Sequence, residues 1–167
     1  MQSVIMMLLV APGAFGQERI QLSDGSQLTV FMVRPAQSSS EPSPLLILMG
    51  GGPGNASISR DTSIWLGSGF AERGWMVAVP VSPNNRAFRG YENNLKVADL
   101  ANVLQQREDI AEGRVMLAGI SNGGMSALEV ARRTVAAIGA DRVGIRLSPP
   151  LLVGGRLGVT RDESGEQ

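Results

Sequence analysis

The stretch VMLAGISNGGMSALEVARR (Val115–Arg133) joins an apolar run, a serine between glycines and a helical pattern. The apolar run ends in Gly119-Ile120-Ser121-Asn122-Gly123, which has the form G-x-S-x-G. Between a buried strand and a helix, this form is typical of a sharp turn that exposes the serine at one edge of a sheet. Small residues at 119 and 123 allow the strand and the helix to approach closely. The alternative for Ser121 is an ordinary helix N-cap, where serine is favoured.

The rest of the chain predicts an α/β fold, with a mainly parallel sheet and helices on both faces. Continuous apolar runs alternate with helical patterns, which is the signature of parallel strands joined by crossover helices. An antiparallel hairpin precedes them over residues 19–35, with its turn at Asp24-Gly25. The runs that predict buried strands are 45–49, 75–80, 114–120 and 142–147, and the helical patterns between them are 63–74, 94–109 and 122–139.

A second glycine-rich segment, Gly50–Gly54, follows the first buried strand. With the G-x-S-x-G turn two strands later, it makes the chain resemble the α/β-hydrolase family, particularly its esterase and prolyl-oligopeptidase-like members. The resemblance covers about residues 17–133. It implies hydrolysis of a carboxylic ester, or of a peptide, in a small-molecule substrate, with Ser121 as the nucleophile. It implies no cofactor and no metal.

The backbone around the two glycine-containing turns suits an oxyanion hole. The N–H of Asn122 would stand at a helix start, where the helix dipole favours negative charge. Gly51 or Gly52 would bring a second N–H to the same point, because a glycine loop exposes its amides. Two alternatives use the same loop: a tight turn without a ligand, and a nucleotide-phosphate loop, for which Asn55 stands in place of the third glycine.

A serine nucleophile needs a base, and this chain contains no histidine. Its one lysine, Lys96, lies in a predicted helix with nothing to bring it near Ser121, and the acids after Ser121 include Asp141, Asp162 and Glu163. We therefore expect a truncated or chimeric hydrolase with little or no turnover. A non-catalytic protein that uses the same pocket to bind a carboxylate or ester is the alternative.

Residues 136–150, AAIGADRVGIRLSPP, resemble a short segment of the old yellow enzyme family of FMN-dependent reductases. In that family the arginine that matches Arg146 binds the flavin. The resemblance implies, as a remote alternative, a fragment of a flavin-dependent oxidoreductase. The other interpretation is a fourth strand of the hydrolase sheet.

The composition and the N-terminus complete the prediction. Fifteen basic and fifteen acidic residues cancel, which disfavours nucleic-acid binding, and the absence of cysteine excludes disulfides and thiolate chemistry. Residues 1–16 contain an apolar run too short to span a membrane and match the core of a secretory signal. We expect a secreted or periplasmic protein with one domain over 17–150 and a loop and polar tail over 151–167. The oligomeric state is left open.

Overall fold

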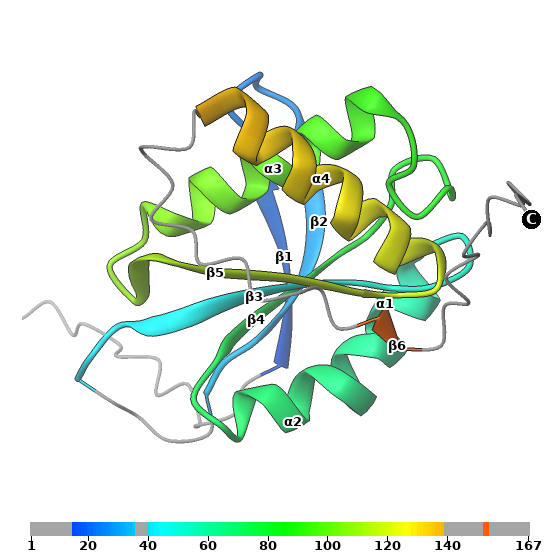
Figure 1. The fold of residues 1–167 in the computed structure, drawn as a ribbon. Coiled ribbons are helices and arrows are strands. Elements are labelled where there is room, and N and C mark those ends of the chain that lie inside the picture. The colour runs from blue at the N-terminus through cyan, green and yellow to red at the C-terminus, as the bar shows by residue number, and fades with distance from the viewer. Residues whose placement is uncertain (1–14, 36–39, 139–151, 154–167) are drawn as a thin grey trace, which may run out of the picture.

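The computed structural model describes residues 15–35, 40–138 and 152–153, which form a mixed sheet between two layers of helices (Figure 1). The strands lie in the order β1-β2-β4-β3-β5-β6. Their bounds are β1 Phe15–Gln21, β2 Gln27–Val33, β3 Ser43–Met49, β4 Met76–Pro80, β5 Ile110–Ile120 and β6 Leu152–Val153. The helical elements are α1 Ala56–Thr62, the short π-helix η1 Ser63–Gly67, α2 Ser68–Ala71, α3 Tyr91–Gln105 and α4 Asn122–Ile138.

The pairing confirms the predicted α/β fold and its N-terminal hairpin. β1 runs antiparallel to β2, and β2 runs antiparallel to β4. β4, β3, β5 and β6 are parallel to their neighbours. At the hairpin turn, Asp24 accepts a hydrogen bond from the backbone N–H of Ser26 (2.8 Å), and Gly25 has φ +80°. Glycine is favoured at that left-handed position because it carries no Cβ.

The core lies on both faces of the sheet, so the strands are buried on two sides. On one face α3 and α4 cover side chains from alternate strand positions, while α1, η1 and α2 cover the other face (Figure 1). The first face includes Val30, Met32, Leu45, Ile47, Met49, Ala78, Phe88, Val97 and Leu100, and the second includes Phe31, Val33, Leu46, Leu48, Val77 and Val79. No helix of the described residues is long and apolar enough to cross a membrane.

The helical segment after β3 begins earlier than the predicted range of 63–74. The side chain of Asn55 caps α1 by accepting a hydrogen bond from the N–H of Ile58 (3.1 Å). The first turns lack an apolar pattern because buried serine replaces apolar residues there. The Ser59 hydroxyl donates to the carbonyls of Gly54 and Pro80 (3.2 and 3.0 Å), which removes the cost of burying it.

Two predictions concern residues that lie mostly outside the described part of the chain. They are the strand at 142–147 and the segment 136–150 that resembles the old yellow enzyme family, with its Arg146. Of these residues only 136–138, the end of α4, are described. The two-residue strand β6 pairs with the end of β5, where Leu152 and Val153 lie opposite Gly119 and Ile120. This short strand falls within the range 151–167, for which the sequence predicts a loop and tail.

Four charged residues join the hairpin to the loop before β5. Arg34 bonds Glu18 (2.9 Å) and Asp109 (3.3 Å), and Arg107 bonds the same two carboxylates (3.2 and 2.9 Å). The hydrogen bond from Arg107 is the main cause that lowers the pKa of Asp109 below its ordinary value of 3.8. The network therefore joins β1 and the end of β2 to the residues just before β5.

We expect Asp109→Asn to cost about 0.5 kcal/mol at pH 6, because partly exposed ion pairs are screened by water. A carboxyl group whose pKa is lower in the folded state contributes stability above the unfolded pKa and loses it as the pH falls through the folded value. The difference between wild type and variant in urea unfolding should therefore shrink below about pH 4. Asp61→Asn, at an exposed position, is the control. An equal difference at pH 6 and pH 2 would contradict this expectation.

Candidate active site

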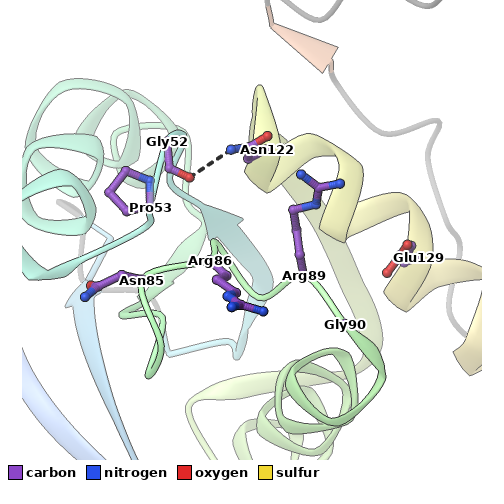
Figure 2. Close-up of a pocket in the computed structure, with 8 residues that line it drawn as sticks. All are labelled: Gly52, Pro53, Asn85, Arg86, Arg89, Gly90, Asn122 and Glu129. Atoms are coloured by element: carbon purple, nitrogen blue, oxygen red, sulfur yellow. Dashed lines mark hydrogen bonds between the residues drawn. The ribbon is translucent and has the colours of Figure 1, made fainter.

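The two glycine-containing turns meet at one edge of the sheet. β3 and β5 are adjacent and parallel, with Met49 opposite Gly119, so the chain leaves both strands at the same edge. The side-chain amide of Asn122 donates a hydrogen bond to the carbonyl of Gly52 (3.1 Å), which joins the glycine loop to the start of α4 (Figure 2). The sequence predicted that these segments converge but gave no sign of this bond.

Ser121 occupies the tip of the turn between β5 and α4. Its φ is +51°, in the left-handed region that non-glycine residues seldom adopt, and the residue is exposed. Such a conformation costs on the order of 1–3 kcal/mol and persists where the surrounding structure imposes it. The backbone carbonyl of Ser121 accepts a hydrogen bond from the N–H of Met125 (3.1 Å), so α4 starts directly from the strained residue.

Gly119 and Gly123 are the residues that make this turn possible. A Cβ on Gly119 would lie 2.3 Å from the carbonyl carbon and oxygen of Gly123. A Cβ on Gly123 would lie 2.3 Å from the carbonyl oxygen of Met49 and 2.5 Å from that of Gly50. These neighbours are backbone atoms, which cannot rotate away as a side chain would. The strand, the helix and the end of β3 therefore approach one another at distances that only glycine allows.

Three backbone N–H groups at this edge have no acceptor within the described part of the chain: those of Gly51, Gly52 and Asn122. Gly51 packs against the end of β5, since a Cβ there would lie 3.2 Å from the carbonyl oxygen of Ile120. Gly52 has φ +55°, a second left-handed position beside Ser121. The site thus combines an exposed hydroxyl with free amide donors from two elements.

Among the described residues, no Lys, Asp or Glu side chain is hydrogen-bonded to the Ser121 hydroxyl. The ammonium group of Lys96 contacts the hairpin turn, with a hydrogen bond to Ser26 (2.9 Å) and an ion pair to Asp24 (3.6 Å). Asp99 accepts two hydrogen bonds from Ser23, each of 2.7 Å. Asp141, Asp162 and Glu163 lie outside the described residues, and Glu129 in α4 accepts a hydrogen bond from the side-chain amide of Asn94.

Sequence reasoning missed the side chains that line the hollow beside this edge. A pocket of about 700 Å³ opens between the glycine loop, the loop after β4 and α4 (Figure 2). The only sign of this pocket in the sequence is the pair of arginines in the polar loop after Pro80, where the sequence predicts no more than a connecting loop. The residues that line the pocket are Gly52, Pro53, Asn85, Arg86, Arg89, Gly90, Asn122 and Glu129.

Comparison with solved structures shows which fold this is. An esterase from the hyperthermophilic archaeon Pyrobaculum calidifontis superposes with a TM-score of 0.60 at 18% identity, over 74% of this chain and 41% of that one. A fungal esterase from Rhizomucor miehei superposes with a TM-score of 0.58 at 16% identity, over 78% and 42%. Dipeptidyl peptidase 4 from Porphyromonas gingivalis gives 0.55 at 18% identity, over 71% and 18%. No protein-family model and no curated sequence matches the chain.

The fold is therefore that of the α/β-hydrolases, whose members here are esterases, lipases and peptidases. The chain spans between about a fifth and two-fifths of the length of these three structures. Their likeness concerns the arrangement of the sheet and helices.

Proposed function

We propose that this chain carries the nucleophile and oxyanion side of a serine-hydrolase site that acts on carboxylic esters. One observation carries the proposal: Ser121 is exposed in a strained turn, next to backbone N–H groups that have no acceptor among the described residues. Attack by its Oγ on an ester carbonyl forms an O–C bond and moves the electron pair of the C=O bond onto oxygen. The N–H of Asn122 and that of Gly51 or Gly52 would donate to this oxyanion. One such donor is typically worth about 3 kcal/mol.

The chain contains no histidine, and among the described residues no side chain is hydrogen-bonded to the Ser121 hydroxyl, so in the proposed chemistry water or buffer takes its proton. General base catalysis by a positioned side chain typically contributes about 10²–10⁴-fold in rate, and the described residues supply no such side chain at Ser121. The same absence favours esters over peptides. An amide nitrogen must be protonated before it leaves, whereas an activated phenolate or alkoxide leaves more readily without a general acid. We therefore propose that the site binds an ester and cleaves it slowly.

Hydrolysis of p-nitrophenyl acetate tests this proposal. We expect a turnover below about 1 s⁻¹, under the values ordinary for enzymes. Ser121→Ala should lower the rate further, toward that of the uncatalysed reaction. A turnover well above 1 s⁻¹ would contradict the missing base, and equal rates for wild type and variant would exclude Ser121 as the site.

Export across a membrane is part of the proposal, supported by the apolar run within residues 1–16. Cleavage ahead of Gln17 would remove the first two residues of β1. N-terminal sequencing of the protein recovered outside the cytoplasm should begin at Gln17. Recovery of the uncleaved chain in the cytoplasm alone would refute export.

A further inference from the structure

The loop between β4 and α3 forms one wall of the pocket through an unusual backbone path. Asn85, Ala87 and Phe88 all have positive φ, at +55°, +48° and +64°. Alanine and phenylalanine gain nothing from this conformation, so the surrounding structure must impose it. The result is that Ala87 and Phe88 are buried, while Arg86 and Arg89 on either side of them remain exposed and line the pocket.

Hydrogen bonds hold this loop to the active-site elements on both sides. The N–H of Ala87 donates to the carbonyl of Pro53 (2.9 Å), in the glycine loop. The buried hydroxyl of Ser126 in α4 donates to the carbonyl of Ala87 (2.6 Å). The hydroxyl of Ser82 accepts from the N–H groups of Arg86 and Phe88, each at 3.3 Å. The arginines therefore stand on a backbone that is fixed relative to the Ser121 turn.

The charges of the pocket are unbalanced. Within the described residues neither Arg86 nor Arg89 forms an ion pair. Glu129, the one acid in the lining, instead accepts a hydrogen bond from the side-chain amide of Asn94. In Figure 2 the Arg89 side chain extends toward the start of α4, where Asn122 binds Gly52. Two positive groups and one negative group leave one positive charge facing the pocket.

We propose that this pocket binds a carboxylate carried by the ester, so that the preferred substrates are monoesters of dicarboxylic acids or similar anionic esters. The inference rests on the proposed function, because it gives that site its substrate class. The guanidinium group suits a carboxylate through paired hydrogen bonds. A single net charge matches a carboxylate better than a doubly charged phosphate. The pocket is lined by Gly52 and by Asn122, the residue after Ser121, so an anion bound there would lie next to the Ser121 turn.

Binding can be measured without cleavage by NMR titration of the full chain carrying Ser121→Ala. The probes are monomethyl succinate and its neutral match, dimethyl succinate. We expect monomethyl succinate to bind about 10-fold more tightly, which corresponds to about 1.4 kcal/mol from charge-assisted hydrogen bonds. Added Arg86→Gln and Arg89→Gln should together reduce the preference to about 2-fold or less. Arg114→Gln, on an exposed part of β5 outside the pocket, should leave it unchanged.

Equal binding of the two probes, or a preference that survives the double arginine variant, would overturn the proposal. Glu129→Gln adds a second readout, because removal of the negative charge should strengthen binding of the monoester severalfold; unchanged or weaker binding would count against the assigned pocket. The spectrum of each variant reports whether the fold is retained. The binding assay uses the Ser121→Ala protein, so it does not depend on catalysis. Equal binding of the two probes by that protein refutes the anion-binding pocket, whereas equal p-nitrophenyl acetate hydrolysis by wild type and Ser121→Ala refutes the proposed function.

Discussion

Gly123→Ala should strongly destabilise the folded state of this protein. The new Cβ would lie 2.3 Å from the carbonyl oxygen of Met49 and 2.8 Å from its carbonyl carbon. Both are backbone atoms of a strand in the middle of the sheet, so relief requires α4 to move away from β3 and β5. Overpacking against side chains usually costs about 1–3 kcal/mol, and a clash with fixed backbone belongs at or above the upper end. We expect a loss of about 3 kcal/mol or more in urea unfolding.

Gly69→Ala is the matched control, because it also adds one methyl group. The nearest atom to its Cβ is the end of the Arg73 side chain, 3.8 Å away, which can move. Gly69 lies in α2, where alanine favours the helix by up to about 1 kcal/mol. The two variants should therefore shift stability in opposite directions. A Gly123→Ala protein within about 0.5 kcal/mol of wild type would show that the turn is looser than described.

Ser121 should be the serine that a fluorophosphonate reagent labels, and Ser121→Ala should abolish that labelling. In other hydrolases one amide donor to the oxyanion contributes about 10²–10³-fold to the reaction rate. The proposed donors would also bind the phosphonyl oxygen of the reagent, so we expect Ser121 to react about 100-fold faster than other serines. Added imidazole should accelerate the reaction about 10-fold or more, since it supplies the base that the chain lacks. Peptide mapping by mass spectrometry gives the site and the rate.

Ser57→Ala is the control for this labelling. Ser57 is an exposed serine in α1, near the glycine loop in sequence but without strained dihedrals. Its replacement should leave the rate at Ser121 unchanged. Labelling spread evenly over exposed serines would contradict an activated position at 121.

The turn around Ser121 could be predicted because its requirements are local. A buried strand, two glycines and a helical pattern are all visible within nineteen residues, and adjacency of parallel strands then brings Gly50–Gly54 to the same edge. The glycine spacing reflects contacts between backbone atoms, which allow few other residues. The fold class followed from the same alternation of apolar runs and helical patterns.

The pocket could not be predicted because it depends on contacts between distant segments. Nothing in the identities of Ala87 and Phe88 indicates a left-handed backbone, which arises from bonds to Pro53 and Ser126 in two other elements. The early start of α1 was missed for a similar reason. Ser59 looks like a surface residue until its hydroxyl is seen bonded to the carbonyls of Gly54 and Pro80.

A crystal structure of the fluorophosphonate adduct would show the proposed oxyanion hole directly. The claim is that Ser121 faces an oxyanion hole formed by backbone amides of two loops. We expect phosphorus bonded to the Ser121 Oγ, with the phosphonyl oxygen about 2.7–3.1 Å from the N–H nitrogen of Asn122 and from that of Gly51 or Gly52. An adduct whose phosphonyl oxygen points into solvent, with none of these amides within hydrogen-bond distance, would contradict it.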